Sequence, residues 1–414
     1  MFTAFSTALS ALVAHSSAVD VVGNNLANLN TAGFKSSTVA FSELVAQVFT
    51  GGLGPTQVGL GVARPTTIRQ FTQGAIQASS GPLDAAIQGD GFLVVKDPLG
   101  RTLYTRGGSL QVDKSGILIT ATGERVQGWS IQGNTLSTIG PVGDIVVPVG
   151  NLKPAVATST FSLDMNLNAA ASAGPPADQF STAIEVFDSL GMSHTVTATM
   201  TKSATPNQWD YSVSVPNSDV TAAFTPVTGS VTFDSAGKLI TPASTGKMPV
   251  VAIKGLTSGA ADMSMTWNLY DGSSNRLTQY AQPSALSANS QDGSQAAQLV
   301  KVGLVDGGKV LAQYSNGQQT VVGQLGMVAV RNPESLISVG NNDFQVSAQT
   351  ASPAIGVPGT GGRGNIIGGA VENSTVDIAK EFTNLIVYQR GYQANSKVIT
   401  TVDELSQDTI NLKR

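Results

Sequence analysis

The sequence of 414 residues contains no cysteine, only two histidines and few charged residues. Without cysteine there can be no disulfide bond, no thiolate metal site and no cysteine nucleophile. Two histidines, His15 and His194, are too few for a three-histidine metal site within one chain. Charged residues make up 12% of the chain, about half of the roughly 25% that is typical of soluble proteins. We therefore expect no enzymatic activity, no cofactor and no metal site.

The sequence also lacks a basic patch and a basic N-terminal region. Lys and Arg number 23 against 27 Asp and Glu, a net charge of −4, whereas nucleic-acid binding needs concentrated basic side chains. The first basic residue is Lys35, so the basic start of a secretory signal is missing. No run approaches the ~18–20 apolar residues that span a membrane. We expect no nucleic-acid partner, no cleaved signal peptide and no membrane insertion.

The N-terminal segment 2–29 has an apolar residue at every seventh position and a single charged residue, Asp20. A seven-residue repeat is typical of a helix that packs along a coiled-coil seam. The repeat consists of Phe5, Leu12, Val19 and Leu26. Because a helix with almost no charge must bury most of its surface, we expect this one to contribute to a helical core shared between subunits.

The C-terminal segment carries the same repeat, preceded by Ser374 and Asp377 at the spacing of a capping box. The repeat consists of Ile378, Leu385, Tyr392 and Ile399. We expect the two terminal helices to pair as a coiled-coil core layer, with the eight repeat residues as assembly contacts. The alternative is a pair of ordinary core helices within one chain.

The long middle of the chain has the alternating pattern and the turn signals of β-structure. Segments 194–200 and 209–215 alternate, and dipeptides such as Asp271-Gly272 and Asn316-Gly317 mark turns. We predict a mainly β protein with helical termini and two β-rich outer domains, the outermost inserted in the inner one. The predicted parts are a terminal helical domain (1–30 with 373–414), a connecting segment (31–72 with 357–372), an inner β-domain (73–150 with 288–356) and an outer inserted β-domain (151–287).

Two motifs with possible chemistry have simpler interpretations. The stretch Gly359–Gly364 matches the G-x-G-x-x-G pattern, but the preceding strand and following helix of a dinucleotide site are missing, which favours a flexible linker. His194 follows Asp188 by six residues, but nothing in the spacing adds the serine that a hydrolase needs. We expect His194 to lie in a turn or on the surface. We expect His15 to occupy a packing or solvent position.

Both chain ends carry long and specific patterns. The first consists of Asn24, Asn25, Asn28, Thr31, Gly33, Phe34 and Lys35. It closely resembles the N-terminal signature of the bacterial flagellar axial proteins of the rod and hook. Segment 374–395 resembles their C-terminal signature, which includes Gln389, Arg390, Tyr392 and Asn395. Blocks 83–92 and 104–106 also resemble this family.

The middle of the chain favours the hook branch of the family over the rod branch. Rod proteins share the terminal signatures but are usually much shorter. Segment 187–194, followed by Trp209, resembles the start of the outer domain of hook proteins. The alternatives are a distal flagellar rod subunit and, from other classes, a secreted β-rich enzyme or an adhesin.

The resemblance implies a structural role in the bacterial flagellum. It implies a self-assembling subunit of a tubular, bendable polymer, the hook, which acts as a universal joint and transmits torque from rod to filament. It implies an extracellular location in the hook, reached through the flagellar type III apparatus without a cleaved signal peptide. The partners it implies are further copies of the chain, the hook cap protein, the distal rod protein, the hook–filament junction protein, the flagellar export apparatus and the hook-length control protein.

Overall fold

The structure is a computed structural model that describes residues 2–44, 47–51, 54–131 and 135–411. It contains two compact units, of which the first comprises Met1–Val149, Lys301–Gln313 and Gln319–Arg414. The second comprises Gly150–Val300 and Tyr314–Gln318. The chain therefore leaves the first unit, builds the second and returns. The predicted fold class, mainly β with paired terminal helices and an inserted outer β-region, is confirmed, while the division into four functional parts stays a prediction.

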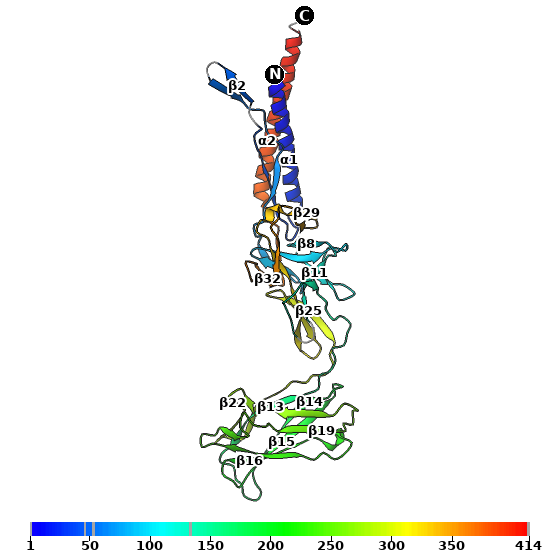
Figure 1. Ribbon diagram of the computed structural model, residues 1–414, viewed down its shortest axis with the longest axis vertical. Coiled ribbons are helices and arrows are strands. Elements are labelled where there is room, and N and C mark those ends of the chain that lie inside the picture. The colour runs from blue at the N-terminus through cyan, green and yellow to red at the C-terminus, as the bar shows by residue number, and fades with distance from the viewer. Residues whose placement is uncertain (1, 45–46, 52–53, 132–134, 412–414) are drawn as a thin grey trace. The chain divides into compact units, whose positions relative to one another are not determined.

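The two ends of the chain form the long helices α1 (Phe2–Ala27) and α2 (Ile378–Asn411), which lie side by side in antiparallel directions (Figure 1). The predicted capping box of Ser374 and Asp377 at the start of α2 is wrong. The Asp377 carboxylate accepts hydrogen bonds from the amides of Ala379 (2.9 Å) and Lys380 (3.2 Å), so Asp377 itself is the N-cap. Ser374 lies one turn earlier and accepts only from the amide of Val376.

The buried positions of α1 are mostly small residues: Ala8, Ala14, Ala18 and Val22. Small side chains allow neighbouring backbone to approach the helix closely. The Val62 amide donates to Ser10 Oγ at 3.2 Å, which places the segment around Val62 against α1.

The first unit is built around the largest sheet that the structure describes, which has 13 strands. Its main path is β25 (Leu299–Val305), β26 (Lys309–Tyr314), β27 (Gln319–Leu325), β11 (Arg125–Ser130), β7 (Phe92–Lys96), β8 (Thr102–Thr105), β30 (Asp343–Gln345) and β29 (Ile337–Gly340). The side strands are β9 (Leu110–Val112), β10 (Leu118–Thr120), β12 (Gly143–Asp144), β28 (Met327–Ala329) and β31 (Ala354–Gly356). Three edge-to-face rings, Phe71, Phe92 and Phe344, pack in its core.

Short two-stranded pairs of the first unit lie outside this sheet. They are β1 (Ser37–Ala40) with β4 (Thr66–Arg69), β2 (Gln47–Gly51) with β3 (Gly54–Val58), β5 (Ile76–Ala78) with β33 (Ala370–Glu372), and β6 (Ala85–Gln88) with β32 (Asn365–Gly368). Both predicted connecting stretches therefore contain paired strands. The flexible-linker interpretation of Gly359–Gly364 is wrong, because the Gly359 amide donates to the Gly364 carbonyl at 2.8 Å and the Arg363 side chain binds the Val357 carbonyl at 3.2 Å.

The second unit packs a mixed sheet and an antiparallel sheet around one core. One sheet contains β19 (Val250–Ile253), β20 (Met263–Trp267), β13 (Thr160–Asn168), β23 (Leu277–Tyr280) and β24 (Ala285–Gln291). The other contains β14 (Gln179–Phe187), β15 (Ser193–Lys202), β16 (Gln208–Ser214), β17 (Val227–Phe233) and β18 (Leu239–Thr241). Trp267 stacks on Phe161 and meets Tyr211 of the facing sheet edge-on at 5.5 Å, which joins the two layers. A small hairpin, β21 (Tyr270–Asp271) with β22 (Ser274–Asn275), completes the unit.

One prediction about membranes needs correction. Segment Thr3–Ala27 is long and apolar enough to cross a membrane, by length and composition only. The Ser and Thr residues of this segment interrupt every apolar run, but its alanines keep the mean hydropathy high. A prediction based on unbroken apolar runs therefore does not include it. The absence of membrane insertion stays a prediction.

Candidate functional site: the junction of the two chain ends

The last turn of α1 is attached to both neighbouring segments by one buried amide side chain. Asn25 Nδ2 donates to the Ser37 carbonyl (2.8 Å) and to Glu381 Oε1 (3.1 Å), and Asn25 Oδ1 accepts from the Ser37 amide (3.0 Å). Asn25 is fully buried. This signature residue therefore fixes α1 to β1 and to α2 at the same point. Burial raises the pKa of Glu381, while the hydrogen bond from Asn25 opposes that change.

The loop that follows α1 is shaped by three further signature residues. Asn28 Nδ2 donates to the Asn24 carbonyl (2.9 Å), and Thr31 Oγ1 donates to Asn28 Oδ1 (3.1 Å). Gly33 has φ +72°, and a Cβ atom there would lie 2.6 Å from the carbonyl oxygen of Arg106. Only glycine fits this combination of a left-handed backbone and a close approach.

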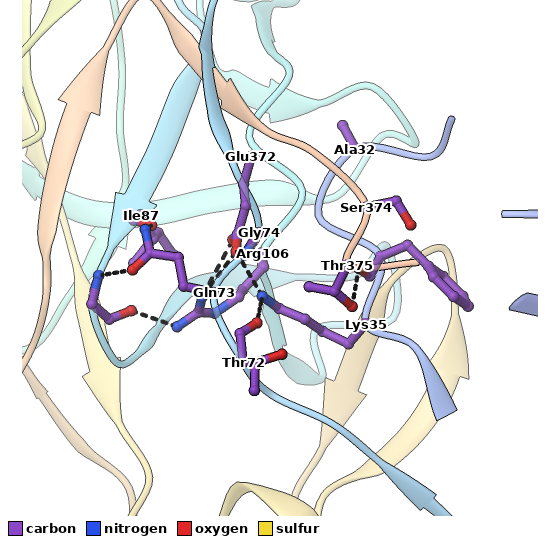
Figure 2. Close-up of polar contacts among 12 residues, drawn as sticks. Ala32, Lys35, Thr72, Gln73, Gly74, Ile87, Arg106, Glu372, Ser374 and Thr375 are labelled. Atoms are coloured by element: carbon purple, nitrogen blue, oxygen red, sulfur yellow. Dashed lines mark hydrogen bonds and ion pairs between the residues drawn. The ribbon is translucent and has the colours of Figure 1, made fainter. Parts of the chain in front are cut away.

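Lys35 and Glu372 form a buried ion pair that joins the N-terminal signature to the end of β33, two residues before the C-terminal signature (Figure 2). Lys35 Nζ lies 2.6 Å from Glu372 Oε1 and donates to the Thr72 carbonyl at 2.6 Å. The Arg106 guanidinium lies 3.3 Å from Glu372 Oε2 and also donates to the carbonyls of Gly89 and Gly91. Burial and the nearby Arg106 charge lower the pKa of Lys35, and the Glu372 carboxylate opposes them.

Main-chain contacts reinforce this ion pair. The Gly33 amide donates to the Glu372 carbonyl (2.8 Å), and the Thr375 amide donates to the Phe34 carbonyl (3.1 Å). The Ser36 amide donates to Thr375 Oγ1 at 2.9 Å. The two signatures therefore form one continuous hydrogen-bonded structure, in which Phe34 is also buried.

The second half of the C-terminal signature lies on α2. Gln389, Arg390 and Tyr392 are exposed, and half-buried Asn395 donates to the Gly391 carbonyl at 2.8 Å. Gly391 itself is required by packing, because a Cβ atom there would lie 2.6 Å from the His15 ring. His15 also contacts the rings of Tyr388 and Phe41, with its centroid 6.3 Å and 5.6 Å from theirs. His15 thus occupies a packing position, one of its two predicted environments.

The eight predicted assembly residues divide into two groups. Three are exposed in the chain by itself: Phe5 (41%), Ile378 (46%) and Tyr392 (43%). The other five are half-buried: Leu12, Val19, Leu26, Leu385 and Ile399. Further exposed apolar side chains lie on the same helices outside the eight repeat positions: Leu9, Val13, Phe382, Ile386 and Val387. The spacing 378, 382, 386 along α2 was a signal that could have revealed two of them.

Glu372 and Thr72 were not identified from the sequence as partners of Lys35, nor was Arg106 identified as the second cation beside Glu372. Arg106 belongs to block 104–106, which resembles the family, but no local pattern connects it to Glu372. The pairing arises only from the fold, because Lys35 and Glu372 are 337 residues apart.

The prediction that His194 lies in a turn or on the surface is wrong. His194 is 3% exposed on β15, with Nε2 3.2 Å from Asp188 Oδ2 and Nδ1 3.1 Å from Asp219 Oδ2. Ser258 Oγ donates to Asp188 Oδ2 (2.7 Å), so in this cluster the serine is bonded to the carboxylate and not to the imidazole as in a hydrolase triad. Across residues 2–44, 47–51, 54–131 and 135–411, no group of three or more His, Asp or Glu side chains could hold a metal ion. The geometry of this cluster supports a structural role.

Family models match most of the chain. The model of the flagellar basal body protein FlaE D2 domain matches residues 157–294, and that of the flagellar hook protein FlgE/F/G D1 domain matches 86–164. The flagella basal body rod protein model matches 5–35, and the flagellar basal body rod FlgEFG protein C-terminal model matches 367–412. Lys35 and Glu372, which join the two chain ends, lie in the two terminal matches.

Full-length relatives agree with these models. The chain is 32% identical to the flagellar hook protein FlgE of Borreliella burgdorferi, with 100% of both chains covered. It is 31% identical to that of Escherichia coli K12, covering 99% of this chain and 100% of the relative. The crystal structure of Helicobacter pylori flagellar hook protein FlgE2 has a similar fold, with a TM-score of 0.54 and 14% identity over 70% of this chain and 99% of that one. By this full-length similarity, the chain belongs to the flagellar hook protein FlgE family.

Proposed function

We propose that this chain is a structural subunit of the bacterial flagellar hook and polymerises through its paired terminal helices. The observation that carries the proposal is the apolar surface that these helices leave uncovered in the single chain. Ile378, Phe382 and Ile386 recur along α2 and are each about half exposed, and Phe5 is exposed on α1. Burying such side chains against further copies removes apolar area from water and favours assembly.

The way the helices are attached supports a mechanical role. The Lys35–Glu372 ion pair and the Asn25 contacts hold both helices at one buried junction with the β-rich part of the first unit. We propose that the polymer bends as a universal joint that transmits torque from rod to filament, with the helices as its inner layer.

The more specific partners and the export route are part of the same proposal. Family membership supports contacts with the distal rod protein at the base, with the hook cap and hook–filament junction proteins at the far end, and with the hook-length control protein. Export through the flagellar type III apparatus is likewise supported by family membership. The mature location is then the extracellular hook.

Electron microscopy of hook–basal bodies from cells with and without the gene tests the proposal. Loss of the hook with an intact rod is the expected result, and a truncated rod would instead indicate a distal rod subunit. Complementation with Tyr392→Asp is expected to restore the folded protein but not the hook, because a charge would replace an exposed apolar contact. The matched control is Gln393→Asp, at an exposed polar neighbour on α2. Normal hooks in the Tyr392→Asp strain would contradict the assigned interface.

A further inference from the structure

The ring of His194 lies between two carboxylates in the second unit. Its Nε2 atom lies 3.2 Å from Asp188 Oδ2, and its Nδ1 atom lies 3.1 Å from Asp219 Oδ2. A neutral imidazole has one N–H and one lone pair, so it can donate to only one of these oxygens. The lone pair of the other nitrogen would then face a carboxylate oxygen, and the two would repel each other. Only the imidazolium, which has two N–H groups, fits both contacts.

The Asp188 carboxylate has no free position for a proton of its own. A carboxylate has about four lone-pair sites. The amides of Leu190 and Met192 each donate to Oδ1 at 2.9 Å, and Ser258 Oγ donates to Oδ2 at 2.7 Å. The His194 ring faces Oδ2 as the fourth partner. Asp188 is therefore ionised, and the positive charge that balances it lies on His194.

Asp219 is the carboxylate that solvent can reach. Its side chain is 23% exposed, whereas those of Asp188 and His194 are 0% and 2% exposed. Asp219 is the last residue of the 3₁₀ turn η1 (Asn217–Asp219), which contains no buried residue. Its carbonyl accepts from the Thr257 amide at 3.0 Å, which leaves its carboxylate to bind the ring. Water can thus replace the ring as a donor to Asp219 but not to Asp188.

We propose that His194 is a proton-operated clasp: its imidazolium form holds η1 against β15 through Asp219, and loss of the Nδ1 proton as the pH rises releases that turn. The Nε2–H group then keeps its hydrogen bond to the buried Asp188. The clasp lies within the second unit and uses none of the residues that join the terminal helices. It therefore gives the outer β-region a pH response that is separate from assembly.

The charges around the ring favour the imidazolium. Beyond Asp188 and Asp219, the elements packed around it carry four titratable groups: Glu185 on β14, Lys202 at the far end of β15, and Lys254 and Asp262 in the segment that contains Ser258. Glu185, Lys254 and Asp262 are exposed. Among the described residues, none of the four forms an ion pair with the cluster. Because two carboxylates face one ring, the closed clasp holds the proton more tightly than the open turn does. Its contribution to stability is therefore present at low pH and is lost as the pH rises.

Nitrogen NMR of the full chain tests the charge on the ring. The chain has only two histidines, so isotope labelling of histidine alone gives signals from His15 and His194, and His194→Gln assigns them. We expect both ring nitrogens of His194 to keep their hydrogens above about pH 6.5, where an ordinary histidine loses one. Above that transition the remaining hydrogen should lie on Nε2. Asp219→Asn should move the transition to lower pH by about one unit or more, because a hydrogen bond between charged groups is lost.

Hydrogen exchange of the full chain tests whether η1 opens. Peptides within 215–224 are compared between the natural chain and Asp219→Asn at the same pH, so that the intrinsic pH dependence of exchange cancels. The side-chain amide that this substitution introduces can donate to the neutral ring and does not titrate. We expect the ratio of exchange rates, natural chain over variant, to rise between pH 6 and pH 8 by up to about tenfold per pH unit.

Glu185→Gln, at an exposed carboxylate on the strand next to His194, is the matched control and should change neither result. If Asp219→Asn does not fold, the NMR titration of the unmodified chain still decides the charge on the ring. Loss of the second ring hydrogen of His194 below about pH 6.5 would overturn the proposal. So would an exchange ratio that stays constant from pH 6 to pH 8.

Discussion

The Nζ atom of Lys35 lies 2.6 Å from Oε1 of Glu372, and both side chains are fully buried. The ends of the chain are therefore joined by an ion pair that solvent cannot replace. Arg106 adds a second buried cation, so one carboxylate accepts from two positive groups. A buried pair of this kind contributes less to stability than its geometry suggests, but losing one partner is costly.

Glu372→Gln should destabilise the first unit strongly, because it leaves Lys35 and Arg106 as buried cations without a counter-charge. We expect a loss of about 3–5 kcal/mol in the free energy of unfolding. Lys35→Met should cost less, since Glu372 keeps Arg106 and the Gly74 amide as donors. Denaturant unfolding of the full chain measures both variants. If both variants lose the same free energy of unfolding, the uncompensated positive charge left by Glu372→Gln does not affect stability.

Gly391→Ala should weaken the pairing of α1 and α2. A Cβ atom at Gly391 would lie 2.6 Å from the His15 ring, which Tyr388 and Phe41 hold in place. Overpacking of this kind typically costs about 1–3 kcal/mol, against about 1 kcal/mol gained from helix propensity. Thermal unfolding followed by helical circular dichroism measures the net loss.

The matched control for this prediction is Gly23→Ala on α1, where a Cβ atom would meet nothing within 4 Å. There only the propensity gain applies, so the control should stabilise its helix by about 1 kcal/mol. The double variant His15→Ala with Gly391→Ala should recover part of the lost stability. If both glycine variants stabilise the protein equally, Gly391 is not in close contact with the His15 ring.

Asp188→Asn should destabilise the second unit at neutral pH and remove part of its sensitivity to acid. Burial alone would raise the pKa of Asp188, but hydrogen bonds from Ser258, His194 and two backbone amides hold that pKa below 3.8. A lowered pKa contributes stability that is present above the ordinary value and is lost as the pH falls through the folded pKa. We expect the free energy of unfolding to fall by about 1–3 kcal/mol at pH 7. We also expect stability to depend less on pH in the acid range.

Hydrogen exchange of peptides within residues 150–300 of the full chain reports on this prediction. Asp210→Asn, at an exposed carboxylate on β16, is the control and should leave both the exchange and its pH dependence unchanged. If the exchange of Asp188→Asn depends on pH in the acid range as strongly as that of the natural chain, other carboxylates cause the acid sensitivity.

The terminal helices and the β-rich middle could be predicted because their patterns are local. Seven-residue repeats and alternating strands need no knowledge of distant partners. Which side chains of the helices are buried inside the chain was less predictable, since the fully buried positions of α1 include small residues such as Ala14 and Ala18, whereas the large repeat residues are half-buried or exposed. Large side chains such as Phe5 are instead left partly exposed.

The buried polar sites could not be predicted, because their partners come from distant or separately folded segments. His194 meets Asp219 only after β15 and the turn before Val220 come together, and Lys35 meets Glu372 only after both ends fold. A sequence shows the residue types but not this proximity. The ordered turn Gly359–Gly364 was missed for a similar reason, since its glycines resemble a linker until the Arg363 contacts are known.

Gly33→Ala should impair the junction more than an equally left-handed glycine elsewhere. Gly33 and Gly100 have φ +72° and +82°, so alanine pays a similar backbone cost of about 1–2 kcal/mol at either position. At Gly100 the added Cβ atom meets nothing within 4 Å, whereas at Gly33 it would displace the Arg106 carbonyl, which lies 2.6 Å away. We therefore expect Gly33→Ala to lose about 1–3 kcal/mol more than Gly100→Ala in denaturant unfolding. Because Arg106 also binds Glu372, that displacement should weaken the junction itself. Hydrogen exchange in residues 370–376 should be faster in Gly33→Ala but not in Gly100→Ala, which would localise the effect to the junction. If both variants lose the same free energy of unfolding, Gly33 is needed only for its backbone conformation.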